Sequence, residues 1–477
     1  MFTNTSKLLA VLLFSMLLNS VHANNLQIST VSLINDTTLS FNISWENSWR
    51  VSTAPNNHDA VWVFIKRKDC ASGQWSHVDL SSLAVDHAVA SPLEVFIDGK
   101  DAGTNAKGLF IRRGSDGFGA ITNVAVSLRM ESLPVGQFDF KVFGVEMVQI
   151  PQGSYQLGDG NTSTGSFRRG NSNSPYIVSS ENNISVSTNA SSLYTSSSTY
   201  RPGSLSANFP KGFSEMYCMK HEISQGQYVD FVNTLTSDQA NNRQVTGTSF
   251  RLNITGSWPI LLANTPHRAM NFLAWADLLA YLDWSAMRPM TELEYEKICR
   301  GPAAAVAGEF AWGSNVITDA NSLVDNGTAN EAAINSIAAG GGIANYNNNV
   351  ILGPIRCGFA AKTATSRQEA GAGFYGAMEM SGNLWEATIS TRTIQGRGFV
   401  GNVGDGQVSV SPNAGYADQA SWPNTQASLI SITSAPGKSI RGASWNEPSN
   451  LLRVSDRSQC NLNSGQRLNE YGGRGVR

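Results

Sequence analysis

The chain has 477 residues, of which 41% are hydrophobic and only 15% are charged. This length suffices for two or three domains, each with its own core. The formal net charge of −2 argues against nucleic acid or anionic lipid as a partner, because it provides no attracting field. The low charge is balanced by 44 Gly and by Ser, Thr and Asn, a composition typical of extracellular, loop-rich β or α+β proteins.

Residues 1–23 have the three-part layout of a signal peptide. Lys7 precedes an apolar run from Leu8 to Leu18, and Val21-His22-Ala23 is a small-residue cleavage pattern. The mature chain is expected to start near Asn24 and to be secreted, extracellular or at the cell surface, with the periplasm also open. No later window approaches the roughly 20 apolar residues of a membrane span.

Residues 24–144 are predicted to form a β-sandwich-like domain. In SFNISWENSW, the apolar residues Phe41, Ile43 and Trp45 alternate with polar ones, which gives a strand one apolar face. DAVWVFIKRKD and GQFDFKVFGVEM repeat this pattern. Clusters of Gly, Asn, Asp and Pro separate the runs, as in a sandwich of short strands.

Residues 145–477 are predicted to form one irregular α+β domain. Its segment 161–208 is rich in Ser, Thr and Asn, and is expected to be a long surface excursion, because such a composition cannot bury a core. N-x-S/T patterns make Asn161 and Asn183 glycosylation candidates.

Helices are predicted after this excursion. SQGQYVDFVNTL has Ser224 as its N-cap and apolar residues at helical spacing, namely Tyr228, Phe231, Val232 and Leu235. AWADLLAYLDW repeats this spacing. In RPMTELEYEKICRG, Thr291 and Glu294 form a capping box that opens a third helix.

The five cysteines are Cys70, Cys218, Cys299, Cys357 and Cys460. The odd number leaves at least one thiol free or paired with another molecule, and the sequence leaves the pairing open. No CxxC pair occurs, so zinc ribbons and thioredoxin-like redox sites are poorly supported.

A series of motifs runs through the C-terminal two thirds: MVQIPQGSYQLGDG, YCMKHEISQGQYVDFVN, AMNFLAWADLLAYLDW, RPMTELEYEKICRG, FAWG, GAMEMSGNLWEA, IRGASW, LRVSDR and GGRGVR. In this order the motifs resemble the formylglycine-generating enzyme (sulfatase-modifying factor) family. The resemblance implies a compact, loop-rich α+β fold related to the C-type lectins.

The family's enzymes use two copper-binding cysteines to oxidise a substrate cysteine to formylglycine. The resemblance places these cysteines between an R-G-G-S-[FWY] element and an R-x-x-x-R element, which here are Arg441–Trp445 and Arg453–Arg457. The intervening residues 446–452 contain no cysteine. Copper(I) selects thiolate ligands, so copper is not expected here.

Ser444 and Trp385 match positions that line the family's pocket, and with Arg453 and Arg457 they would form a vestigial pocket. The alternative interpretation is a turn serine and a core tryptophan. Cys299 matches a disulfide cysteine of the family, but Val454 stands at its partner's position.

The resemblance also implies structural calcium. Around EMSGNLWE, Glu379 and Glu386 would supply carboxylates, and Gly382 and Leu384 would supply carbonyl oxygens, the hard ligands that Ca²⁺ prefers. The alternative is a structural turn in which Glu386 simply caps or pairs. A second site would use three further residues, Asn321, Ser322 and Asn349.

Three functions stay open on the sequence. The first is a non-catalytic exported protein that binds or assembles with itself, with other surface proteins or with glycans. The second is a formylglycine-generating-type oxidase or another enzyme using different pocket residues, such as Glu447, Asp456, Arg453 and Ser444. The third is a carbohydrate-binding module, suggested by the 11 Trp.

Overall fold

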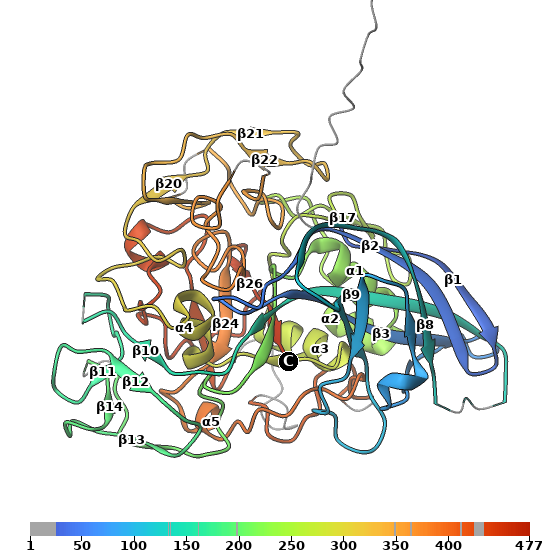
Figure 1. The fold of residues 1–477 in the computed structure, drawn as a ribbon, viewed down its shortest axis with the longest axis horizontal. Coiled ribbons are helices and arrows are strands. Elements are labelled where there is room, and N and C mark those ends of the chain that lie inside the picture. The colour runs from blue at the N-terminus through green and yellow to red at the C-terminus, as the bar shows by residue number, and fades with distance from the viewer. Residues whose placement is uncertain are drawn as a thin grey trace, which may run out of the picture.

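The computed structural model describes residues 25–131, 133, 135–160, 162–196, 199–347, 350–362, 365–410, 413–423 and 434–477. The predicted signal peptide, Asn161 and Asn349 lie outside these residues. Figure 1 shows the N-terminal strands, blue to teal, at the right, where they overlap the green helices in this view, and the yellow to red C-terminal loops mostly to their left.

The outermost layer is a four-stranded antiparallel sheet in the order β1-β2-β8-β5. Its strands are β1 (Gln27–Asn35), β2 (Thr38–Arg50), β8 (Gly117–Arg129) and β5 (Ala88–Val89), with a short 3-10 helix η1 (Ala84–Asp86) before β5. In β2, Phe41, Ile43 and Trp45 are 0–2% exposed while their neighbours are partly exposed, which confirms the predicted alternation.

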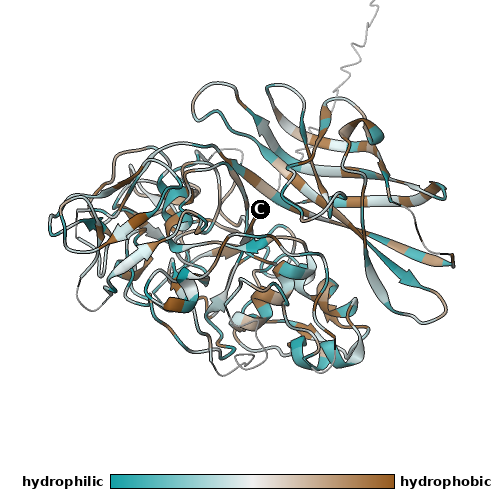
Figure 2. Ribbon diagram, turned by 90° about the horizontal axis from the view of Figure 1, so that it is seen from below, coloured by the Kyte–Doolittle hydropathy of each residue, from teal (hydrophilic) through white to brown (hydrophobic). Residues whose placement is uncertain are grey.

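A second sheet of eight strands lies beneath it, in the order β19-β27-β16-β9-β3-β7-β6, with β4 paired to β3. The strands are β19 (Arg288–Pro289), β27 (Gly475–Val476), β16 (Met216–Met219), β9 (Phe138–Ile150), β3 (Asp59–Asp69), β7 (Leu109–Arg113), β6 (Leu93–Phe96) and β4 (Trp75–Val78). Figure 2 shows hydrophobic and hydrophilic residues alternating along strands of the N-terminal part.

Strand β3 is buried on both faces, because two cores meet there. Val61, Val63 and Ile65 belong to the core between the two sheets. Trp62 and Phe64, one residue out of phase, belong to the core shared with the C-terminal part. Successive side chains of a strand point to opposite faces, so one strand serves both cores.

The predicted boundary between residues 144 and 145 falls inside β9. This strand pairs with β3 along its length and with β16 at Met147–Ile150. The indole of Trp62 donates a hydrogen bond to the carbonyl of Ser285, 2.9 Å away. The N-terminal strands and the C-terminal part are therefore joined by a continuous sheet.

The helices are α1 (Gln225–Asn233), α2 (Ser237–Arg243), α3 (Trp275–Trp284), α4 (Glu292–Arg300) and α5 (Ile394–Arg397). Ser224 caps α1, and the Thr291–Glu294 capping box opens α4, as predicted. Tyr228, Phe231 and Val232 are buried. No helix among the described residues has the length and apolar character to cross a membrane.

The polar excursion 161–208 contributes to the core, contrary to the prediction. It forms part of two small sheets with strands β10 (Tyr155–Leu157), β11 (Arg168–Arg169), β12 (Tyr176–Val178), β13 (Ile184–Val186), β14 (Leu193–Tyr194) and β15 (Gly203–Leu205). Five of its apolar residues are at most 6% exposed and join the main core, namely Phe167, Ile184, Val186, Leu193 and Leu205. The prediction rested on the average polarity of the segment, which hides short buried stretches such as β13, where Ile184 and Val186 alternate with the exposed Ser185.

The remaining strands are short. They form the pairs β17 (Ile254–Thr255) with β18 (Leu262–Ala263), β20 (Ile317–Asp319) with β23 (Gly342–Ala344), and β21 (Leu323–Val324) with β22 (Ala332–Ala333). A three-stranded sheet combines β25 (Lys438–Arg441), β24 (Trp385–Ile389) and β26 (Tyr471–Gly472). Strand β24 of this last sheet carries two of the predicted site residues, Trp385 and Glu386, and Leu384 directly precedes it.

Candidate functional site

The segment that the family uses for catalysis runs from β25 to a short 3-10 helix, η2 (Ser449–Leu452). Arg441 is the last residue of β25, and Arg453 directly follows η2. The turn before β24 holds both ends of the loop between them, because the amide of Gly382 donates to the carbonyl of Gly442 and the hydroxyl of Ser381 donates to that of Leu452, both at 2.8 Å.

Helix α4 holds the arginine-rich flanks through buried ion pairs. Glu292 accepts hydrogen bonds from Nε and Nη2 of Arg457, both at 2.9 Å, and lies 3.4 Å from Arg441. Arg441 also pairs with Glu296 at 2.9 Å. Burial opposes the charge of Glu292, but Arg457 and Arg441 prevail and hold the pKa of Glu292 below its usual value. These two arginines are thus engaged in holding the fold.

Two of the predicted pocket residues, Ser444 and Trp385, contact Glu447. The amide of Glu447 donates to the carbonyl of Ser444 at 3.2 Å, and its carboxylate accepts a hydrogen bond from the side chain of Trp385. Burial, and then the nearby Glu470, raise the pKa of Glu447 above its usual value, against the Trp385 hydrogen bond. Ser444 and Trp385 are 0% and 3% exposed, so both are largely packed inside.

Arg453 and Arg457 point to different surroundings. Arg457 packs its guanidinium 3.8 Å from the centre of the Phe167 ring and donates to the carbonyl of Gly165. Arg453 lies against Gly308, where an added Cβ would be 3.3 Å from its Nε, and this buried Nε has no partner among the described residues. The four predicted residues therefore do not form one pocket.

No thiol pair supports copper. All five cysteines are free, and four of them are buried. Burial raises the pKa of Cys299 above its usual value, and it raises the pKa of Cys218 to about 12, which disfavours the thiolate that binds copper. Arg300 and Ser455, the residues that follow Cys299 and Val454, are hydrogen-bonded at 3.0 Å. The residues present do not fit a copper(I) ion.

The first predicted calcium site is organised around a guanidinium. Arg474 donates from Nε to both carboxylate oxygens of Glu386, at 2.9 and 2.8 Å, and from Nη2 at 2.6 Å. Its remaining N–H groups donate to backbone carbonyls of Met219, Lys220 and Met378. Because Arg474 already supplies the positive charge to both oxygens of Glu386, this arrangement does not fit a calcium ion.

Close packing and further hydrogen bonds surround the other residues of this predicted site. Gly382 has a φ of +89°, and an added Cβ would lie 2.7 Å from the carbonyl of Asn345, so only glycine fits. The amide of Leu384 donates to Glu222 at 3.0 Å. Glu379 accepts from the amide of Gly358 at 3.0 Å.

Glu379 and His221 form a buried pair whose charges are suppressed. Their Oε2 and Nδ1 atoms are 3.4 Å apart. Burial raises the pKa of Glu379 to about 7, against the lowering effect of Arg474, and burial lowers the pKa of His221 to about 3. His221 is therefore neutral at pH 7.

A chelator test distinguishes the guanidinium from a metal. Excess EDTA is expected to leave the melting temperature of the purified chain unchanged, because Arg474 and not an ion neutralises Glu386. A structural ion would stabilise the fold by mass action, so its removal would lower the melting temperature by several degrees. Differential scanning calorimetry with and without chelator, and with added Ca²⁺, measures this. A drop that Ca²⁺ reverses would contradict the expectation.

The second predicted calcium site is bridged by an amide. Nδ2 of Asn335 donates to Oδ1 of Asn321 at 2.6 Å, and its Oδ1 accepts from the amide of Ser322 at 3.1 Å. The glycosylation candidate Asn183 is exposed just before β13, which is compatible with modification.

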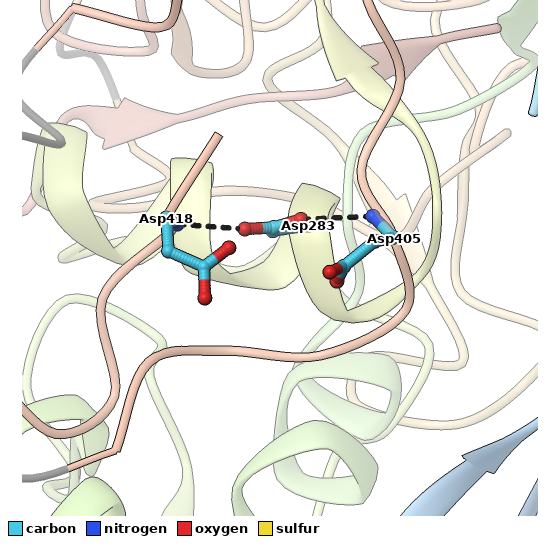
Figure 3. Close-up of side chains that lie close together, drawn as sticks. All are labelled: Asp283, Asp405 and Asp418. Carbon is cyan, nitrogen blue, oxygen red and sulfur yellow. Dashed lines mark hydrogen bonds between the residues drawn. The ribbon is translucent and has the colours of Figure 1, made fainter. Parts of the chain in front are cut away.

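Three aspartates that the sequence did not indicate as a site lie close together in the structure. Asp283 at the end of α3 comes within 4.8 Å of the carboxylates of Asp405 and Asp418. Its oxygens accept the backbone amides of Asp405 at 3.1 Å and Asp418 at 2.9 Å (Figure 3). Burial and then Asp405 raise the pKa of Asp283 well above its usual value. Asp283 thus holds a loop that is distant in sequence, since Asp405 and Asp418 follow it by 122 and 135 positions. A local sequence pattern does not indicate contacts between residues so far apart.

Comparison with known families agrees with this geometry. A model of the sulfatase-modifying factor enzyme 1-like domain matches residues 140–477, most of the chain, beginning inside β9. No curated protein matches the sequence. The chain belongs to the formylglycine-generating enzyme (sulfatase-modifying factor) family.

Proposed function

We propose that the chain is a non-catalytic member of this family that serves as an exported scaffold for binding or assembly. The observation that supports this proposal is the state of residues 441–457, which match the catalytic segment of the family's enzymes. Its flanking arginines Arg441 and Arg457 are bound to Glu292 of α4, while the segment between the flanks carries no thiol. A fold does not fix a function, and here the fold keeps its frame without the groups that oxidise cysteine.

Export is part of the proposal. The layout of residues 1–23 supports it, and so does the scarcity of charged residues along the chain. Partners on this account are further copies, other surface proteins or glycans outside the cell.

Strand β1 is the surface proposed for assembly. It is the edge of the outer sheet, and eight of its nine residues are exposed. No charged residue occurs from Gln27 to Asn35, whereas edge strands are usually protected by charge. Its exposed apolar side chains, Val31, Leu33 and Ile34, are 39%, 48% and 59% exposed. Figure 1 shows β1 at the outer margin of the molecule.

Assembly through β1 can be tested with a charge. Ile34→Lys is expected to convert any assembled form to monomers, because a lysine on the edge disfavours strand pairing and apolar contact. Light scattering after size-exclusion chromatography, together with electron microscopy of native material, measures the assembled mass.

A matched control lies at the opposite side of the same sheet. Val85 in η1 is 90% exposed, and Val85→Lys adds the same charge near β5 instead of β1. This variant should assemble like the unmodified chain. A native protein that is strictly monomeric, or equal loss of assembly in both variants, would contradict the proposal.

A second candidate is another enzyme that uses the old pocket. The raised pKa of Glu447 beside Ser444 and Trp385 favours it, since perturbed carboxyl groups are common in active sites. A carbohydrate-binding role has less support. Eight of the 11 tryptophans are at most 4% exposed and thus unavailable for stacking on sugars, namely Trp45, Trp62, Trp275, Trp284, Trp312, Trp385, Trp422 and Trp445.

A further inference from the structure

A cavity of about 470 Å³ lies where the end of β2 and the start of β8 meet residues 361–362 and 365–378. Four aromatic residues line it: Trp49, Phe118, Phe374 and Tyr375. Phe118 is 76% exposed, a large apolar side chain at the mouth with little cover. The volume lies within the range of small-molecule sites.

The walls are held in place from both sides. The register of β2 against β8 shifts between Trp45 and Ser48, which directs Trp49 toward the C-terminal part. An added Cβ at Gly376 would lie 3.0 Å from the Trp49 ring, so the loop and the ring are in close contact. Asn57 donates to the carbonyl of Tyr375 at 2.8 Å. The cavity is thus preformed.

The polar lining is cationic. Lys220, Lys362 and Arg367 line the cavity, and none of the described lining residues is Asp or Glu. Lys220 is paired with Glu146 at 3.2 Å. Among the described residues, the side chains of Lys362 and Arg367 hydrogen-bond only to backbone carbonyls, those of Ala333 and Ala372. Two positive charges at an aromatic cavity therefore lack an anionic partner.

Tyr375 is an uncharged member of the aromatic lining. Burial raises the pKa of Tyr375 to about 12, so its hydroxyl stays protonated at neutral pH. Arg367 lies 5.9 Å from the centre of the Phe374 ring, at the boundary between the cationic and the aromatic lining. A flat apolar ligand with one negatively charged group would contact both the aromatic and the cationic lining residues.

We propose that this cavity binds a small aromatic carboxylate, with its ring among Trp49, Phe374 and Tyr375 and its carboxylate on Arg367 and Lys362. A guanidinium and a carboxylate can form two parallel hydrogen bonds, which favours Arg367 as the main anchor. Offset stacking on the aromatic walls adds affinity and fixes the ring plane. This site is separate from β1 and from the segment 441–457, so it does not depend on the proposed scaffold role.

Binding of 2-naphthoate to the full chain, followed by isothermal titration calorimetry, tests the proposal. Its neutral isostere 2-naphthamide keeps the ring and removes the charge. The carboxylate is expected to bind about tenfold more tightly than the amide, since charge-assisted hydrogen bonds are roughly twice as strong as neutral ones. Raising the salt concentration should reduce this difference.

Variants locate the binding. Arg367→Gln should weaken naphthoate binding about three- to tenfold, and Ala361→Trp, which fills the cavity, should abolish it. Arg129→Gln removes an exposed arginine of β8 outside the cavity and should change nothing. Equal affinity for acid and amide, absence of binding at millimolar concentration, or unchanged binding in both cavity variants would overturn the proposal.

Discussion

Glu292→Gln is expected to lower the free energy of unfolding by about 3–5 kcal/mol at pH 7, because it leaves two buried guanidinium groups without their shared counter-charge. Both Arg441 and Arg457 are at most 1% exposed and pair with this carboxylate. Glutamine keeps the size of the side chain and can accept only part of these hydrogen bonds. Urea denaturation followed by circular dichroism measures the loss.

The pH dependence separates the charge from simple packing. The pKa of Glu292 lies below its usual 4.5, so its contribution to stability is present above about pH 4.5 and is lost as the pH falls further. The gap between the variant and the unmodified chain should therefore shrink in acid. Glu369→Gln, at an exposed position, is the control and should change stability by less than about 0.5 kcal/mol. Equal stability of Glu292→Gln and the unmodified chain would contradict the account.

Arg474→Met is expected to be as damaging, by about 3–5 kcal/mol at pH 7, since it leaves Glu386 buried and unpaired. Glu379 lies in the same buried region, where it raises the pKa of Glu386 and of Glu222. The variant also loses the hydrogen bonds that Arg474 donates to the carbonyls of Met219 and Met378. Thermal and urea unfolding measure the loss.

The stability deficit of Arg474→Met also depends on pH, because it leaves carboxyl groups with raised pKa values. Burial already raises the pKa of Glu386 and brings that of Glu379 to about 7, and removal of Arg474 raises both further. When folding raises the pKa of a carboxyl group, the free energy of unfolding falls as the pH rises from the group's usual pKa toward the raised one. The deficit of Arg474→Met should therefore grow from pH 5 to pH 8. Arg129→Met, at an exposed site, is the control, and a deficit independent of pH would contradict the charge argument.

Local sequence patterns predicted local structure well. The alternation of Phe41, Ile43 and Trp45 identified β2, and the caps at Ser224 and Thr291 identified the starts of α1 and α4. Each of these signals depends on residues within a few positions of one another. The family frame also came from the sequence, because the motifs keep their order across residues 140–477.

Long-range pairing escaped the sequence. The alternating sequence of β9 does not indicate its partners. In the structure β9 pairs with both β3 and β16, and it therefore crosses the predicted domain boundary. Arg474 reaches Glu386 across 88 positions, and only the folded chain shows that a guanidinium bonds both oxygens of the predicted calcium ligand. The sequence offered this pairing as an alternative without naming the partner.

The arrangement of residues 441–457 was predicted in part. The sequence showed that residues 446–452 lack cysteine, and the structure places Ser444 and Trp385 around Glu447. It separates Arg453 from Arg457, because one lies against Gly308 and the other is bound to Glu292. Side-chain directions at the two ends of a loop depend on what packs there, which spacing alone does not specify.

The central claim, that this family member does not oxidise cysteine, is tested most directly by exposing it to substrate. The full chain, loaded with copper(I), is incubated with a CxPxR peptide in oxygenated buffer, and oxygen uptake and peptide mass are recorded. The account predicts an unchanged peptide and no oxygen uptake above that of copper(I) alone, because no thiol lies between Trp445 and Arg453 to hold the metal. Conversion of the cysteine to an aldehyde would contradict it.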